Sequence, residues 1–146
     1  MKSRGIARVG VLASGHDVAE QAHSGVLARR MLGAGSSLVS EYPPGVAAHK
    51  GSFIERDRIQ AGLSAAVLVI ESGLDSGTMH TARAAREAGV PLFALLPEDA
   101  MVQAHKGPSG LAAGFQGNWN LISSGAALRV ASLARFMEAV ETLTGR

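Results

Sequence analysis

The sequence predicts an α/β protein in which helices cover both faces of a mostly parallel sheet of about four or five strands, which makes three layers. Short apolar runs alternate along the chain with segments of helical periodicity, as expected for successive strand and helix units. Aromatic residues make up only 4% of the chain while Ala and Gly are abundant, which favours close packing of helices on a sheet. The length of 146 residues suits a single domain over residues 1–146.

The first part of the chain predicts two strands separated by one helix. The apolar run Arg8–Ala13 is typical of a buried parallel strand. Asp17 can cap a helix, and apolar residues recur at helical spacing over Val18–Met31. Ser37–Ser40 is predicted to be a second short strand. Glu41–Gly45 contains two prolines, which remove amide donors, so we expect a rigid loop there.

The middle of the chain predicts two further pairs of strand and helix. Phe53–Leu63 has the pattern of a helix, and Ala65–Glu71 is the strongest strand pattern in the sequence. Because Ala65–Glu71 is apolar on both faces, we expect it to be a central parallel strand. Met79–Ala88 is predicted as a helix that Gly89 ends. Val90–Leu96 is another buried strand.

The last part of the chain has a weaker pattern. Gly and Pro are scattered through Pro97–Gly117, which predicts a loop. Asn118–Ser124 is predicted as a short helix, Ala126–Val130 as a short edge strand, and Leu133–Leu143 as a closing amphipathic helix.

Composition excludes several classes of function. The chain has no cysteine, which rules out disulfides and thiolate metal sites and indicates a reducing compartment such as the cytoplasm. The apolar run behind the basic segment Met1–Arg8 is too short for a signal peptide or a membrane span. The five histidines show no spacing suited to a shared metal. There is no G-x-S-x-G elbow and no G-x-G-x-x-G loop, so we expect no serine-hydrolase triad and no metal, NAD or FAD cofactor.

One candidate site follows the strongest strand. Ligands of open α/β sheets bind beyond the carboxyl ends of the strands, and Ser76, Gly77 and Thr78 lie there at the start of a predicted helix. Two hydroxyls, free backbone amides and the positive helix end suit a phosphate. The alternative is that Ser76 merely caps the helix.

A second candidate site combines positive charge with an aromatic ring. Its residues are Lys50, Gly51, Phe53, Arg56 and Arg58. Together they offer charges for phosphates and a ring for a base to stack on, which are the two requirements of single-stranded nucleic acid. The net charge is only +2, so any attraction must come from such local clustering. In the alternative interpretation, Phe53 belongs to the core and the arginines pair with Glu55 and Asp57.

Several motifs, in order, resemble the DprA/Smf family of DNA-processing proteins. Ser40–Gly45 is S-E-Y-P-P-G, and Gly51–Ser64 is similar to the family's G-N-F-x-x-R-N-R-I-I-A-G-L-S. Glu71–Arg83 resembles its E-A-x-x-x-S-G-S/T-x-x-T-A-R stretch, and Gly117–Ala126 its G-x-N-x-L-I-x-x-G-A stretch. The resemblance spans roughly Val9–Val140.

The resemblance implies a Rossmann-like domain in a cytoplasmic protein that binds single-stranded DNA, protects incoming strands during transformation and loads the RecA recombinase without catalysis. Carried over by position, Lys50 would meet a phosphate and Phe53 would stack on a base. Arg56 and Arg58 would line a basic pocket, and Ser76–Thr78 would hold a phosphate.

The chain also departs from the family pattern. It starts after the G-S-R and S-G-x-A-x-G-I-D loops, so we expect a Rossmann domain shortened by its amino-terminal half and without an added winged-helix domain. Ser52 and Asp57 replace two asparagines, and Asp57 adds a negative charge. Binding by one protomer should therefore be weak, so that several protomers along one strand, or a partner chain that supplies the missing half, would be needed. A sheet that lacks its first strands also exposes an edge that could pair with another copy in a homodimer.

Two alternative functions stay open at this point. The first is a binding module for a nucleotide or nucleotide derivative, which one phosphate loop would suit. The second is an enzyme similar to nucleotide phosphoribohydrolases, whose P-G-G-x-G-T-x-x-E loop resembles Ser76–Thr78. The acid of that loop falls at Thr81, and Glu71 is the nearest substitute.

Overall fold

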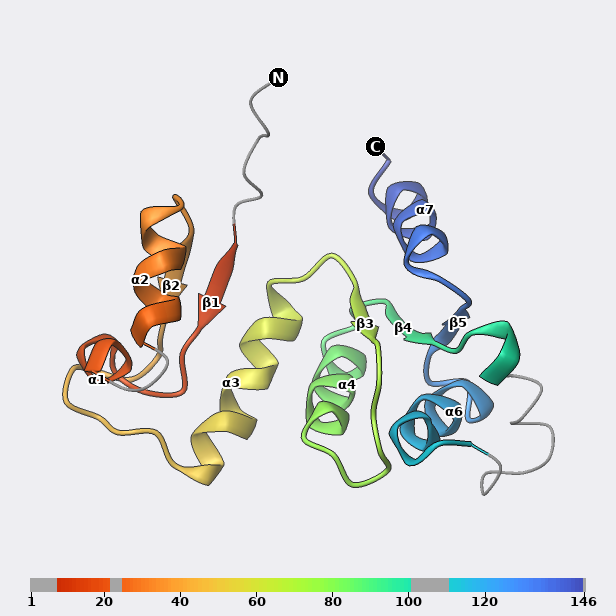
Figure 1. Cartoon of the computed structure of the whole chain (residues 1–146), viewed down its shortest axis with the longest axis horizontal. Coiled ribbons are helices and arrows are strands. Elements are labelled where there is room, and N and C mark those ends of the chain that lie inside the picture. The colour runs from red at the N-terminus through yellow and green to blue at the C-terminus, as the bar shows by residue number, and fades with distance from the viewer. Residues whose placement is uncertain (1–7, 22–24, 101–110, 146) are drawn as a thin grey trace. The chain divides into compact units, whose positions relative to one another are not determined.

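The computed structural model describes residues 8–21, 25–100 and 111–145. The chain divides into two compact units, residues 1–59 (unit 1) and residues 60–146 (unit 2). They are coloured red to yellow and yellow-green to blue in Figure 1. The prediction of a single domain over the whole chain stays a prediction.

Unit 1 contains a parallel pair of strands. β1 (Val9–Val11) pairs with β2 (Ser37–Val39) in register from end to end. Two helices connect them, α1 (His16–Gln21) and α2 (Gly25–Gly33), and α2 packs on β2 (Figure 1). The prediction of one helix over Val18–Met31 was wrong: α1 and α2 are separate helices that pack against each other, and residues 22–24 between them lie outside the described part.

Helix α3 (Lys50–Gly62) starts before the predicted Phe53. The reason is a reciprocal cap at its first turn. The Ser52 backbone N–H donates to Nδ1 of His49 at 3.3 Å, and the His49 N–H donates to Oγ of Ser52 at 2.9 Å. This is the geometry of a capping box, with a histidine ring in the place that Ser or Thr usually takes.

Unit 2 contains a three-stranded parallel sheet. Its strands are β3 (Val67–Val69), β4 (Leu92–Leu95) and β5 (Leu128–Val130), in the order β3-β4-β5. The predicted strands are all present. The central strand of this sheet is β4, which pairs with both neighbours, whereas the sequence pattern had favoured β3. The prediction that the last strand lies at an edge is confirmed.

Helices cover both faces of the sheet in unit 2. Leu92 and Ala94 of β4 face a core shared with α4 (Thr78–Glu87) and α6 (Gln116–Ser123). On the opposite face Phe93 meets Phe136 of α7, with their ring centroids 5.4 Å apart in an edge-on contact. Helix α7 covers Leu133–Thr144. The layered α/β prediction is therefore confirmed for this unit.

The predicted loop Pro97–Gly117 is only partly described. Residues 98–100 are helical and a 3-10 helix, η2, covers Ala113–Phe115, so the segment is less irregular than its Gly and Pro content suggested. Residues 101–110 lie outside the described part. Among the described residues, no helix is long and apolar enough to cross a membrane.

Candidate nucleic-acid interface

In unit 1 the loops that follow the two strands are bonded to each other. The Ser40 loop, residues 40–46, follows β2, and Oγ of Ser40 donates to the Ser14 carbonyl at 2.7 Å and accepts from the Tyr42 N–H at 3.0 Å. Gly15 lies so close to this loop that a Cβ would stand 2.5 Å from the Pro43 carbonyl oxygen. The Ser40 loop is therefore held in place against the residues that follow β1, which agrees with the rigid loop that the two prolines predicted.

Asp17 fastens the far end of the Ser40 loop. Because α1 begins at His16, Asp17 lies inside the first turn and is not the N-cap that the sequence suggested. Both of its carboxylate oxygens accept the Gly45 N–H at 3.0 Å. This bond is the largest cause that holds the pKa of Asp17 below 3.8, helped by the amides of Val18 and of Asp17 itself.

We expect Asp17 to make the stability of unit 1 depend on acid pH. Its folded pKa is lowered, so its contribution is complete above the unfolded value of about 3.9 and is lost as pH falls through the folded pKa. Urea unfolding should show Asp17→Asn less stable than wild type at neutral pH, with a gap that narrows on acidification. A gap that stays constant as pH falls, or an Asp17 titration by NMR with its midpoint at or above the unfolded value, would contradict this.

The α3 surface consists of Lys50, Phe53, Arg56 and Arg58 on one helix. Lys50 and Gly51 form the first turn, and Lys50 is exposed with no hydrogen bond or ion pair to any described residue. The Phe53 side chain is 48% exposed, so the alternative that it belongs to the core is wrong. An aromatic ring at the start of this helix is therefore available to a ligand.

Arg56 supports the Phe53 ring. The two residues are one turn apart, and Cζ of Arg56 lies 5.7 Å from the ring centroid, within the range of a cation–π contact. Nη2 of Arg56 lies 3.5 Å from Oδ1 of Asp57, a carboxylate that is almost buried. Within the described residues, Nε of Arg56 is buried without a hydrogen-bond acceptor. Arg56 therefore lies against the Phe53 ring, and its Nε–H is left without an acceptor among the described residues.

Arg58 has a different partner from the one its neighbours in sequence suggested. Its Nη2 donates to Oε1 and Oε2 of Glu41 at 2.6 and 2.5 Å. Glu55 instead accepts the hydroxyl of Tyr42, and this bond is the main reason that the pKa of Tyr42 lies above 10.0. The alternative that both arginines pair with Glu55 and Asp57 is therefore right for Arg56 alone.

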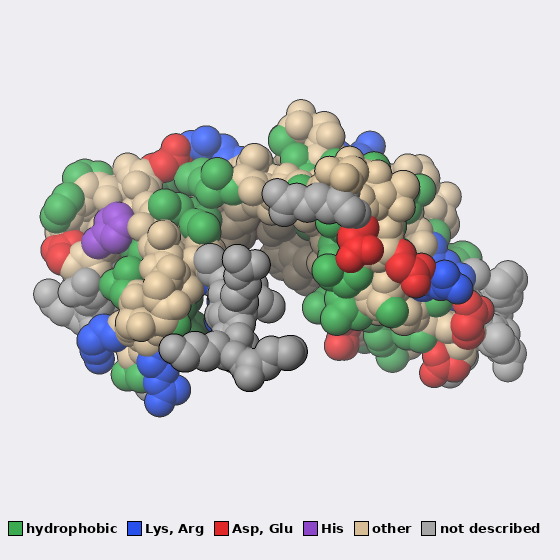
Figure 2. Space-filling model, turned by 90° about the horizontal axis from the view of Figure 1, so that it is seen from above, with side chains coloured by type: hydrophobic (Ala, Val, Ile, Leu, Met, Phe, Trp, Pro, Cys, Tyr) green, Lys and Arg blue, Asp and Glu red, His purple; other side chains and the backbone are tan. Residues whose placement is uncertain are grey.

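The net charge of the α3 surface and its partners is close to zero. Arg56 and Arg58 pair with Asp57 and Glu41, and the charge of Glu55, which accepts the Tyr42 hydroxyl, offsets that of the unpaired Lys50. In unit 2 the charges are also mixed: Figure 2 shows basic and acidic side chains interspersed over the right-hand part of the face in view. Attraction of a polyanion by charge alone is therefore weak.

In unit 2 the loop before α4 leaves backbone donors open. Ser76 does not cap the helix, because its Oγ pairs with Oγ of Ser72 at 2.7 Å. The N-cap residue is Gly77, and no side chain caps it. Among the described residues, no hydrogen-bond acceptor meets the N–H groups of Gly77 and Thr78. The predicted amide donors at this helix start are thus unoccupied.

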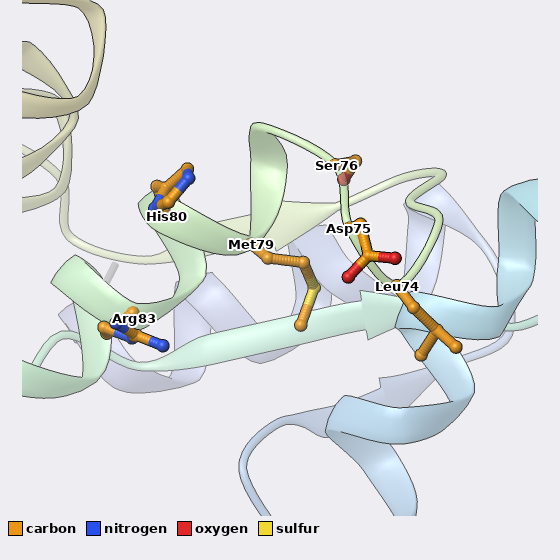
Figure 3. Close-up of a pocket in the computed structure, with 6 residues that line it drawn as sticks. All are labelled: Leu74, Asp75, Ser76, Met79, His80 and Arg83. Carbon is orange, nitrogen blue, oxygen red and sulfur yellow. The ribbon is translucent and has the colours of Figure 1, made fainter. Parts of the chain in front are cut away.

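Beside this loop lies the α4 pocket, a hollow of about 270 Å³. Its lining residues are Leu74, Asp75, Ser76, Met79, His80 and Arg83. In Figure 3, Leu74, Asp75 and Ser76 come from the loop, Met79 projects between the loop and the helix, and Arg83 and His80 stand on α4. Of the three predicted phosphate-binding residues only Ser76 lines the pocket, and Glu71, the substitute acid considered for an enzyme, does not.

The carboxyl ends of β3 and β4 are joined by Asn118 of α6. Its Nδ2 lies 3.2 Å from the Val69 carbonyl, 3.0 Å from that of Ile70 and 2.8 Å from that of Leu95. The residue is fully buried, and its Oδ1 has no hydrogen-bond donor among the described residues. Asn118 therefore fixes the strand ends from which the loop to α4 departs.

The sequence model of the family described as DNA recombination-mediator protein A matches residues 2–141. The chain belongs to this family. Relatives within it include Protein Smf of Escherichia coli K12, 41% identical over 87 residues, which are 60% of this chain and 23% of that protein. The putative DNA processing protein DprA of Mycobacterium tuberculosis H37Rv is 40% identical over 89 residues, 61% of this chain and 22% of that protein. The matches span less than a quarter of these relatives.

Solved structures of DNA processing protein A have the same fold. The Streptococcus pneumoniae protein superposes with a TM-score of 0.70 at 29% identity, over 92% of this chain and 43% of that one. The Helicobacter pylori protein, whose structure concerns its single-stranded DNA binding mode, gives a TM-score of 0.70 at 24% identity, over 94% of this chain and 56% of that one. The Rossmann-like fold expected from the motifs is confirmed.

The predicted residues fall into both units of the chain. Lys50, Gly51, Phe53, Arg56 and Arg58 lie together on α3 in unit 1, and Ser76, Gly77 and Thr78 lie at the start of α4 in unit 2. Sequence reasoning missed Glu41, Asn118 and Arg83 as participants. All three stood in a motif, but only the fold shows what they contact. No cluster of three metal-binding side chains occurs among the described residues.

Proposed function

We propose that this chain binds single-stranded DNA through the α3 surface. The observation that carries the proposal is the exposed Phe53 ring at a helix start, backed by the Arg56 guanidinium. A ring presented in this way can stack on an unpaired base, and neighbouring cations can follow the phosphates of the same strand. Lys50 is the cation most ready to do so, because no described residue pairs with it.

The family comparison supports a role in DNA processing. The Mycobacterium tuberculosis relative and the two solved structures are DNA-processing proteins by name, and the Helicobacter pylori structure concerns single-stranded DNA. We place the chain in the cytoplasm, in DNA uptake, transformation or recombination, where it would bring DNA strands to a RecA-type recombinase without catalysis of its own. Its partners in this proposal are the strand, the recombinase and a second protomer.

Binding by one protomer is expected to be weak. One base stacked on Phe53 contributes about 1 to 3 kcal/mol. Even if Lys50, Arg56 and Arg58 all met phosphates, the salt slope for a single strand would be only about −2. Because Arg56 and Arg58 already have carboxylate partners, the slope should be smaller still. Several protomers along one strand, or a homodimer, would supply the affinity that one lacks.

The test is a titration of the full chain with labelled oligo-dT at about 50 and 200 mM salt, beside one with thymidine monophosphate. We expect binding to oligo-dT at low salt, a shallow loss of affinity at the higher salt, and far weaker binding of the mononucleotide. No binding of oligo-dT at low salt would refute the proposal. Equal affinity for the mononucleotide would refute it as well, because the ligand would then be a small molecule.

The second candidate is a nucleotide or nucleotide derivative in the α4 pocket. It is favoured by Ser76 and Arg83, which line the pocket, and by the open N–H groups of Gly77 and Thr78 at the helix start that follows Ser76. If it is correct, Arg83→Ala should weaken binding of thymidine monophosphate and leave oligo-dT binding unchanged. Arg86→Ala, an exposed arginine of the same helix outside this pocket, is the matched control.

A further inference from the structure

We propose that Glu41 is an internal competitor for the DNA phosphate at Arg58. In the unbound chain its carboxylate occupies the guanidinium, and an incoming strand has to displace it. The inference rests on the proposed function of the α3 surface and concerns how that surface is regulated. It makes part of the positive charge of α3 available only to a ligand that can take the place of a carboxylate.

The Glu41 carboxylate occupies one nitrogen of the Arg58 guanidinium. Both of its oxygens approach Nη2, at 2.6 and 2.5 Å, and this nitrogen belongs to the fork of donors with which arginine binds phosphate. The remaining donors of Arg58 have no acceptor among the described residues. A phosphate could therefore first bind the open side of the guanidinium and then replace the carboxylate.

The exchange requires only a side-chain movement. The backbone of the Ser40 loop is held by the bonds of Ser40 to the Ser14 carbonyl and of Asp17 to the Gly45 amide. The two partners of the ion pair are themselves open to solvent, with side-chain exposures of 63% for Arg58 and 46% for Glu41. Exposed pairs of this kind are weak and exchange readily, so the carboxylate lowers affinity without blocking the site.

A competing role and a positioning role for Glu41 predict opposite changes in DNA affinity when its charge is removed. If Glu41 held Arg58 in place for DNA, removing its charge would weaken binding. If Glu41 competes, removing its charge strengthens binding. It also steepens the salt dependence, because Arg58 then neutralises a phosphate without first leaving a carboxylate. The sign of the change and the salt slope together separate the two roles.

The experiment measures oligo-dT binding by the full chain across a range of salt, for wild type, Glu41→Gln, Arg58→Ala and the double variant. We expect Glu41→Gln to bind about two- to fivefold more tightly, the equivalent of one exposed ion pair. Its salt slope should be steeper by about 0.7. In the Arg58→Ala background the gain should be mostly absent. Glu41→Ala is a second variant that should give the same result.

Glu138→Gln is the matched control, since Glu138 pairs with Arg135 of α7 at 2.8 Å in a similarly exposed bridge far along the chain. It should leave binding unchanged. The inference is overturned if Glu41→Gln binds oligo-dT with unchanged or weaker affinity, or if its gain in affinity persists in full in the Arg58→Ala background. In either case, binding of oligo-dT by the wild type would leave the proposed function intact. If neither wild type nor Glu41→Gln binds oligo-dT at low salt, both are overturned.

Discussion

Asn118→Asp is expected to lower the free energy of unfolding by about 3 to 5 kcal/mol. The Asn118 amide donates to carbonyl oxygens of Val69, Ile70 and Leu95 and is fully buried. An ionised carboxylate in the same place would meet three acceptors and no donor. It would lose the hydrogen bonds and add a buried charge without a partner. The change in shape is negligible, so the effect isolates the polarity of one atom.

Urea unfolding at neutral pH measures this effect. Asn120→Asp is the matched control, because Asn120 lies on the same helix α6 with its side chain exposed, and it should change stability by less than about 0.5 kcal/mol. The prediction fails if the two variants unfold at similar urea concentrations. Since Asn118 joins the ends of β3 and β4, we also expect Asn118→Asp to disorder the α4 pocket before the rest of unit 2.

Phe53→Ala is expected to weaken binding of oligo-dT by about five- to a hundredfold. Loss of one stacked base costs about 1 to 3 kcal/mol, and each 1.4 kcal/mol is tenfold in affinity. The side chain is 48% exposed, so its removal should leave the fold stable. Stacking carries no net charge, and the loss should therefore be similar at low and high salt, unlike the loss caused by removing a cation.

Two variants give this test its control. Ile54→Ala removes a neighbouring side chain of α3 that is 42% exposed, without removing a ring, and it should bind nearly as wild type does. Phe53→Trp keeps an aromatic surface and should keep most of the affinity. A loss as large in Ile54→Ala as in Phe53→Ala would show that the apolar surface of α3, and not base stacking, holds the strand.

Local patterns in the sequence predicted most of the helices and strands. The apolar run that predicts β4 is buried in the sheet, and α7 begins at the predicted Leu133. These features depend on periodicity and on residues a few positions apart, which is the range over which sequence spacing is informative. The start of α3 was missed because a histidine ring took the capping role, which propensity does not anticipate.

The sequence by itself determined the α/β class, the motifs of the recombination-mediator family and the candidate residues on α3 and α4. Only the tertiary structure decided how those residues are occupied. Glu41 reaches Arg58 across 17 positions of the chain, and Asn118 reaches Val69 across 49. Such contacts form only when folding brings distant segments of the chain together, so the spacing of residues along the sequence does not predict them. For the same reason, whether Phe53 was core or surface could be settled only by its packing.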